Sequence, residues 1–230
     1  MSDFAGKHVV VTGGSGALGR AVVDLLLRRG AQVHVPCVES EPPPSVAGRD
    51  GVRAVGDVDM TDANSVASFY AGVPELWASI QIAGGFRMAA FEDTSVDDLR
   101  FLLELNVVTC FNACREAVVA MRGRGGRIVN VAARPAISPL QGAGVVAYAA
   151  SKSAVATMTR ALGEEVAGQN ILVNAIVPSI IDTPANRAAM PDAKHEDWAT
   201  VEELAQTIVH LASADNHVVR SALVPVFGRT

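Results

Sequence analysis

The chain has 230 residues, of which 50% are hydrophobic and 19% are charged, so the composition excludes an intrinsically disordered protein. The formal net charge of -5 supplies no large positive field to hold nucleic acid or an anionic membrane surface. Three cysteines are too few for a disulfide framework and favour a reducing compartment. No signal-peptide pattern and no membrane-length apolar run is found. We therefore expect a cytoplasmic, single-domain protein over residues 1–230, with no bound metal.

Strand-like and helix-like segments alternate along the chain. Short aliphatic and β-branched runs predict strands at residues 8–11, 32–35, 52–55, 79–83, 127–131, 172–177 and 223–226. Apolar residues at helical spacing predict helices at residues 18–29, 61–70, 96–103, 107–121, 147–166 and 201–212. This alternation indicates βαβ units and an α/β fold. We expect a Rossmann-type, doubly wound parallel sheet of about seven strands with helices on both faces.

A glycine-rich turn joins the first predicted strand to the first predicted helix. Gly13, Gly16 and Gly19 recur at every third position. Glycine lets the backbone turn tightly and lets a pyrophosphate approach, while the following helix directs free N–H groups at the phosphates. An ordinary βα turn is the alternative. We expect a dinucleotide to bind at Thr12, Gly13, Ser15, Gly16, Ala17, Leu18 and Gly19.

The end of the second strand normally distinguishes the two nicotinamide cofactors. An acidic side chain there binds the ribose hydroxyls of NAD, and a basic one accepts the 2′-phosphate of NADP. In this chain Cys37 occupies that place, and Glu39 follows slightly late. Arg20 and Arg53 are the nearest basic candidates. The sequence therefore leaves the choice between NAD and NADP open.

Two further residues after the third predicted strand are candidates for the cofactor site. Asp57 and Val58 lie where a carboxylate could meet the adenine amino group. The alternative is that Asp57 only caps a turn. The residues do not decide between these two interpretations.

Tyr148 and Lys152 are four residues apart near the start of a long predicted helix, so they share one helix face. A nearby ammonium favours the phenolate, and lowering the pKa of a tyrosine by about three units takes roughly 4 kcal/mol. Tyr148 could then exchange a proton with a substrate oxygen while a hydride moves. The alternative is an ordinary amphipathic helix.

Taken together, these residues resemble the short-chain dehydrogenase/reductase (SDR) family over nearly the whole chain. The resemblance implies that Asn106 is catalytic, orders a water for a proton relay, and acts beside Tyr148 and Lys152. It implies that Tyr148 and Lys152 also contact the cofactor, with Lys152 holding the nicotinamide ribose. It adds further cofactor-binding residues at Ala83, Gly84, Pro178, Ile181 and Thr183.

Two departures from the family pattern bear on activity. The family's Asn-Asn-Ala-Gly motif becomes Gln81 to Gly84, without either asparagine. Ala133 stands where the family's catalytic serine normally lies, and losing such a donor costs on the order of 10²–10³ in rate. Either Ser138 replaces it, or the substrate needs no such donor. The dihydropteridine reductase branch resembles this chain in lacking the serine and in its Ala-Gly-Gly at residues 83–85.

The resemblance implies an NAD(P)-dependent oxidoreductase that acts on a small carbonyl, alcohol or imine-like substrate. The alternative is a dinucleotide-binding sensor or scaffold protein with reduced catalysis. The resemblance also implies a homo-oligomer, either a dimer or a tetramer. Residues 184–198 are expected to form a short lid. Phe86, Met88 and Phe91 could line the substrate pocket, and the alternative is that they only pack. We expect no nucleic-acid or membrane partner.

Overall fold

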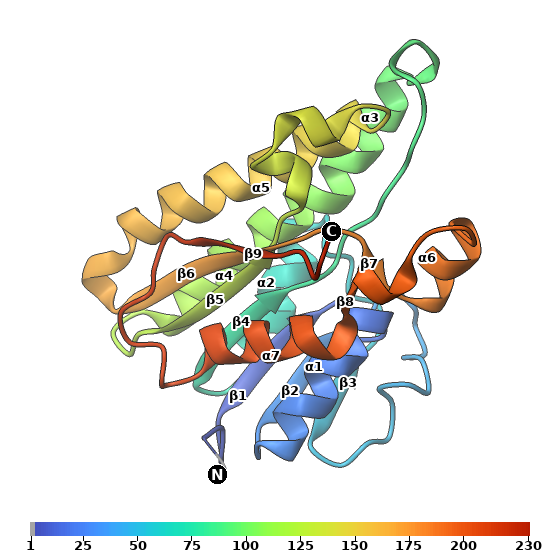
Figure 1. The fold of residues 1–230 in the computed structure, drawn as a ribbon. Helices are drawn as coiled ribbons and strands as arrows, with labels where there is room; N and C mark the ends of the chain where they lie inside the picture. The colour runs from blue at the N-terminus through green and yellow to red at the C-terminus, as the bar shows by residue number, and fades with distance from the viewer. Residues whose placement is uncertain (1–2) are drawn as a thin grey trace.

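The computed structural model describes residues 3–230 and builds them around one parallel sheet (Figure 1). Its strands are β1 (His8–Thr12), β2 (Gln32–Pro36), β3 (Val52–Val55), β4 (Leu76–Gln81), β5 (Gly126–Val131), β6 (Ile171–Pro178) and β9 (Leu223–Val226). The strand order is β3-β2-β1-β4-β5-β6-β9, and every neighbouring pair is parallel. Two short strands, β7 (Ile181–Asp182) and β8 (Ala199–Thr200), pair separately. The predicted doubly wound α/β fold with seven sheet strands is confirmed.

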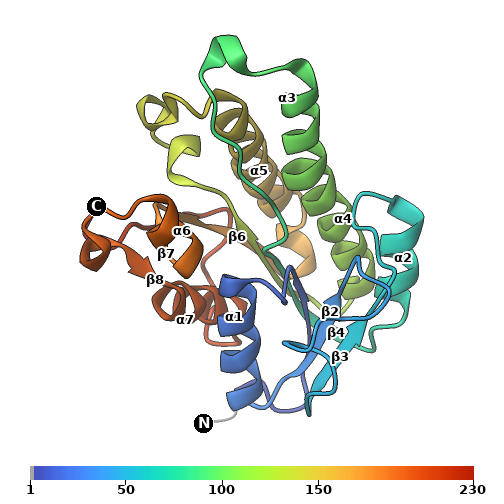
Figure 2. The same ribbon diagram turned by 90° about the vertical axis from the view of Figure 1, so that its right-hand side faces the viewer.

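Helices cover both faces of the sheet. They are α1 (Ala17–Arg28), α2 (Ala63–Ala71), α3 (Val96–Leu103), α4 (Thr109–Met121), α5 (Val146–Glu165), α6 (Pro184–Ala189) and α7 (Val201–Ala212). Figure 2 shows α1 and α7 on one face and α2, α4 and α5 on the other. Along β1, Val9 and Val11 enter the core under α1 and α7, whereas Val10 faces the opposite layer, as strand alternation requires. None of the helices in the described residues is long and apolar enough to cross a membrane.

Several boundaries differ from those predicted. Strand β4 ends at Gln81, because the N–H groups of Ile82 and Ala83 turn to the Thr12 hydroxyl at 3.1 and 3.2 Å. A π-helical turn (Glu104–Val108) joins α3 to α4, so the two predicted helices are continuous. Helix α6 was not predicted, because its six residues carry no apolar periodicity.

The glycine-rich turn packs so closely that a side chain at Gly13 or Gly19 would run into backbone atoms. Gly13 has a φ of 66°, and a Cβ on it would lie 2.8 Å from the Ala83 nitrogen. A Cβ on Gly19 would collide with the Gly13 carbonyl oxygen. A Cβ on Gly16 would meet that same oxygen at 3.4 Å, which is an ordinary contact. The turn therefore needs glycine at positions 13 and 19 for packing alone.

This difference can be tested with matched substitutions. We expect Gly19→Ala to lower the free energy of unfolding by about 1–3 kcal/mol through overpacking. Gly16→Ala should stay within about 1 kcal/mol of the wild type, the range of an N-cap replacement. Urea unfolding without any ligand measures both values. Equal losses in the two variants would contradict the packing explanation.

A histidine pair links β1 and β2 at the opposite end of the strands. His34 is 5% exposed, and its Nε2 shares one hydrogen bond with Nδ1 of His8 at 2.9 Å. Burial, and then the nearby His8 and Arg53, lower the pKa of His34 to about 4. The folded state therefore binds this proton less readily than the unfolded state, whose histidine has its usual pKa of about 6.5.

The stability of the protein should consequently depend on pH. Neutral His34 makes its full contribution to the free energy of unfolding above pH 6.5. As the pH falls from about 6.5 to about 4, this contribution is lost, and the free energy of unfolding should fall by on the order of 3 kcal/mol. His34→Gln should remove this part of the slope. Urea unfolding at several pH values measures it, with the exposed His217→Gln as control. An unchanged slope in His34→Gln would refute the assignment.

Candidate active site

The expected site residues gather at the carboxyl ends of the central strands. The strand order reverses between β1 and β4, which makes this edge the topological switch point of the sheet. In open α/β sheets ligands bind in the crevice outside the carboxyl ends of the strands at such a point. The turn after β1 and the loop after β4 meet here through Thr12 and Ala83.

The start of α1 suits a phosphate. Helix α1 begins after Gly16, which provides no side-chain cap, and its first turn contains no acidic residue. Its first N–H groups therefore remain available, and the helix dipole favours an anion. Leu18 and Gly19 are buried under the turn, so only their backbone atoms can contact a phosphate. The residues present fit the pyrophosphate of a dinucleotide.

The end of β2 differs from the expectation for a cofactor-binding side chain. The Cys37 thiol is buried and directed at the Val35 carbonyl at 3.8 Å, and burial, followed by the nearby Glu39, raises its pKa. Only the backbone of Cys37 can reach a ligand. Arg53 donates to the Gly72 carbonyl at 2.9 Å and is directed away from this edge.

The segment after β3 is held against the end of β2. Asp57 has a φ of 56°, and its N–H donates to the Glu39 carbonyl at 3.1 Å. The N–H of Val58 donates to the Cys37 carbonyl at 2.9 Å. These bonds place both residues beside the end of β2, next to the glycine-rich turn in the strand order. A cofactor contact by Asp57 and Val58 stays a prediction.

Asn106 joins the loop after β4 to the start of α5. It lies buried in the π-helical turn, where its Oδ1 accepts from the Gly85 N–H at 2.9 Å and its Nδ2 donates to the Gly85 carbonyl at 3.0 Å. Nδ2 also donates to the Ser151 hydroxyl at 3.1 Å. That hydroxyl in turn donates to the Tyr148 carbonyl at 2.8 Å. Asn106 thus positions the helical turn that carries Tyr148.

Lys152 lies directly beneath this network. Its Nζ is buried and donates to the Val131 carbonyl, at the end of β5, at 2.9 Å. Burial lowers the pKa of Lys152 to about 8. A Cβ on Gly84 would lie 3.4 Å from Nζ and 2.6 Å from Oδ1 of Asn106. The structure therefore brings Gly84, Asn106 and Lys152 together, although they lie far apart in the sequence.

Tyr148 is the half-buried member of the cluster. Its ring packs edge-on against Phe86, with ring centroids 4.9 Å apart. Burial raises the pKa of Tyr148 to about 12. This direction follows from the removal of the phenol from water. The lowering that the Lys152 ammonium and an oxidised nicotinamide would cause stays a prediction.

The end of β5 has no hydroxyl aimed at this phenol. Ala133 is buried in an extended conformation two residues after the end of β5. Ser138 precedes a 3-10 turn (Pro139–Gly142), and its N–H donates to the Arg134 carbonyl at 2.9 Å. Among residues 3–230, no hydrogen bond joins the Ser138 hydroxyl to Tyr148. A substitute role for Ser138 stays a prediction.

The segment after β6 forms the far side of the site. Pro178 ends β6, and Ile181 begins the short β7. The Thr183 hydroxyl accepts from the Asn186 N–H at 3.2 Å and caps α6. The Asn186 side chain donates to the Ile181 carbonyl at 2.8 Å. Residues 184–198, predicted to be a lid, are therefore folded around α6, whereas their movement stays a prediction.

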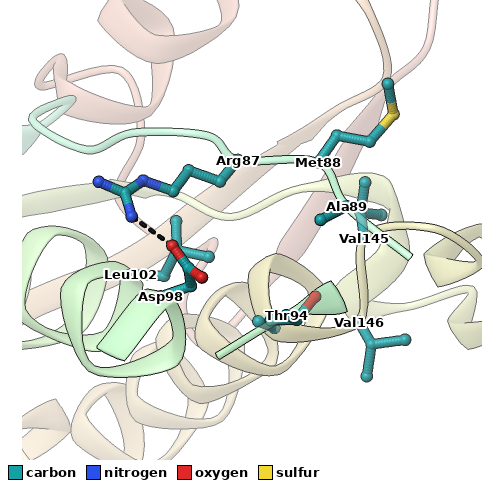
Figure 3. Close-up of a pocket in the computed structure, with 9 residues that line it drawn as sticks. Arg87, Met88, Ala89, Thr94, Asp98, Leu102, Val145 and Val146 are labelled. Atoms are coloured by element: carbon teal, nitrogen blue, oxygen red, sulfur yellow. Dashed lines mark hydrogen bonds and ion pairs between the residues drawn. The ribbon is translucent and has the colours of Figure 1, made fainter. Parts of the chain in front are cut away.

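A hollow of about 210 Å³ opens between the loop after β4 and the start of α5 (Figure 3). Its lining is mostly apolar and comes from the loop after β4, helix α3 and the start of α5: Arg87, Met88, Ala89, Thr94, Asp98, Leu102, Val145, Val146 and Ala147. Arg87 and Asp98 form an ion pair across it. Of these residues the sequence singled out Met88 alone, because the others belong to no motif. The hollow can hold a small neutral group.

Comparisons with known proteins agree with this geometry. The family model described as short chain dehydrogenase matches residues 7–194. A 2,5-dichloro-2,5-cyclohexadiene-1,4-diol dehydrogenase of Sphingobium indicum is 31% identical over 202 residues, which cover 83% of this chain and 78% of that protein.

Two similar solved structures contain a nicotinamide cofactor. A blue fluorescent protein from a metagenomic library, in complex with NADPH, is 28% identical with a TM-score of 0.86, and the match covers 98% of both chains. A Beutenbergia cavernae protein with bound NADP is 30% identical with a TM-score of 0.88, and the match covers 99% of this chain and 97% of that one. Since the family model spans most of the sequence, this chain belongs to the short-chain dehydrogenase family.

Proposed function

We propose that this chain is an NAD(P)-dependent oxidoreductase that transfers a hydride between the nicotinamide and a small carbonyl, alcohol or imine-like substrate. The observation that carries this proposal is the buried cluster of Tyr148, Lys152 and Asn106 at the carboxyl ends of β4 and β5. Family membership and the two cofactor-bound neighbours support it. The choice between NAD and NADP stays open.

Residues at the two ends of the crevice would bind different parts of the cofactor. Backbone N–H groups from the glycine-rich turn would hold the pyrophosphate. The ammonium group of Lys152 has three N–H donors, and one of them bonds to the Val131 carbonyl. The other two would bind the nicotinamide ribose. When bound, the nicotinamide supplies or accepts the hydride. Pro178, Ile181 and Thr183 would enclose it from the side of β6.

Tyr148 would handle the proton. With a pKa of about 12, its phenol is protonated at neutral pH and suits the role of a general acid in carbonyl reduction. In the oxidative direction, the positive charge of Lys152 and of an oxidised nicotinamide would favour the phenolate. Both N–H groups of the Asn106 amide and one lone pair of its Oδ1 already take part in hydrogen bonds. One lone pair of Oδ1 therefore remains to accept a hydrogen bond from an ordered water.

The exposed outer face of α4 supports the homo-oligomer that the resemblance implies. Phe111 is 55% exposed and Val119 is 50% exposed along this helix. These two side chains lie two turns apart on one face, on either side of Arg115, and exposed apolar patches often mark protein interfaces. We include a dimer or tetramer of this chain in the proposal.

Removing the phenolic hydroxyl tests the proposed reaction. Tyr148→Phe should reduce turnover by at least about 10²-fold, since it removes the proton donor, while affinity for NADPH or NADH changes little. Calorimetry measures the binding, and nicotinamide absorbance measures turnover across a panel of carbonyl and alcohol substrates. Undiminished turnover in this variant would contradict the mechanism. Cofactor binding by the wild type without turnover of any substrate would favour the sensor or scaffold alternative.

Two serine substitutions test the end of β5. Ala133→Ser should raise turnover about tenfold or more, because it adds a hydrogen-bond donor beside the reacting oxygen. Ser138→Ala should keep turnover within about twofold, because its hydroxyl makes no contact with Tyr148. Steady-state kcat/KM on one carbonyl substrate measures both. A hundredfold loss in Ser138→Ala would show instead that Ser138 has replaced the missing serine.

A further inference from the structure

Arg134 lies where the carboxyl ends of three strands meet. It directly follows Ala133 and begins the 3-10 turn Arg134–Ala136 after β5. Its guanidinium carbon lies 4.8 Å from the centroid of the Phe227 ring, which directly follows β9. The Ser179 N–H donates to the Val226 carbonyl at 3.4 Å, so the end of β6 adjoins the same place. Arg134 thus lies at the carboxyl edge of the sheet, the edge at which ligands of such sheets bind.

The guanidinium of Arg134 lacks a partner. Its Nε is buried and makes no hydrogen bond, whereas the buried Nε of Arg127 donates to the Asn216 carbonyl at 2.7 Å. Among residues 3–230, no carboxylate oxygen lies within 4.0 Å of the Arg134 nitrogens. A buried donor of a charged group without an acceptor is unfavourable, and such groups in proteins normally have a partner. The described residues supply no acceptor to this Nε, so a water or a bound ligand would have to supply it.

Two other arginines near these strand ends are already paired with carboxylates. Arg87 pairs with Asp98 across the hollow in Figure 3, and Arg187 binds Asp182 with two hydrogen bonds at 2.6 and 2.7 Å. Their charges are neutralised within the chain, so neither is available to a charged ligand. The uncompensated positive charge of Arg134 distinguishes its position.

We propose that Arg134 binds an anionic group of the substrate, a carboxylate in the first instance. The planar guanidinium offers parallel N–H donors that match the two oxygens of a carboxylate, and the Phe227 ring covers one of its faces. Holding the substrate by an acid group would also orient its reacting carbon without the hydroxyl that Ala133 lacks. This inference rests on the proposed function and narrows it to substrates that carry an acid group.

The test measures binding of small carboxylates to the full chain by calorimetry, with and without NADPH. The probes are acetate and benzoate, with the uncharged amides acetamide and benzamide as matched controls. At least one carboxylate should bind about tenfold or more tightly than its amide. Arg134→Gln should weaken that binding about tenfold or more, and Arg134→Lys should weaken it less. Arg28→Gln, an exposed charge change on α1, should leave it unchanged.

The inference fails if carboxylate and amide bind alike, if neither carboxylate binds the wild type, or if Arg134→Gln binds as the wild type does. It also fails if Arg134→Gln changes the oligomeric mass, since the acceptor would then belong to a second copy of the chain. Should Arg134→Gln not fold, the loss of affinity is measured on Arg134→Lys. None of these readouts uses turnover. Carboxylate binding by a protein without any turnover would therefore overturn the proposed reaction and leave the anion site standing.

Discussion

The structure depends on the close approach of two backbones at the switch point of the sheet. The Thr12 hydroxyl accepts hydrogen bonds from both Ile82 and Ala83, and Gly13 approaches the nitrogen of Ala83 without a side chain between them. This contact fixes the end of β1 against the end of β4. The contact therefore joins the phosphate-binding turn firmly to the loop that reaches Asn106. It keeps the two halves of the crevice at a constant separation.

Burial then determines the chemistry of the cluster. Lys152 loses water on folding and retains one carbonyl partner, so its positive charge is weakly compensated within the chain. The Tyr148 phenol beside it is also partly removed from water, which stabilises its protonated form. A desolvated cation next to a neutral acid responds strongly to any charge that enters the crevice. The protonation state of the site is consequently set by what binds there.

The regular parts of the fold could be predicted from the sequence, because strand and helix periodicities and the glycine spacing are local signals. The alternation of strands and helices, the long α5 and the position of the glycine-rich turn follow from such signals. The features that were not predictable depend on contacts between distant segments. The early end of β4 requires Thr12, and the inward thiol of Cys37 follows from core packing.

In the candidate site, too, the features with a local sequence signal could be predicted and those that depend on distant contacts could not. Tyr148 and Lys152 could be identified by their spacing, and Asn106 by resemblance to a family. The raised pKa of Tyr148 without a cofactor could not be predicted, because a spacing of four residues says nothing about desolvation. Arg134 belongs to no motif, and its missing partner becomes visible only when the ends of β5 and β9 are brought together.

The cap on α6 has a consequence for ligand entry. The Thr183 hydroxyl accepts the Asn186 N–H, which fixes its rotamer and leaves its own proton free to donate. A ligand carbonyl on that side would meet a donor whose direction is already set, so little side-chain freedom is lost when the bond forms. The bond that caps α6 therefore does not use the hydroxyl proton of Thr183, so the cap and a donated hydrogen bond are compatible.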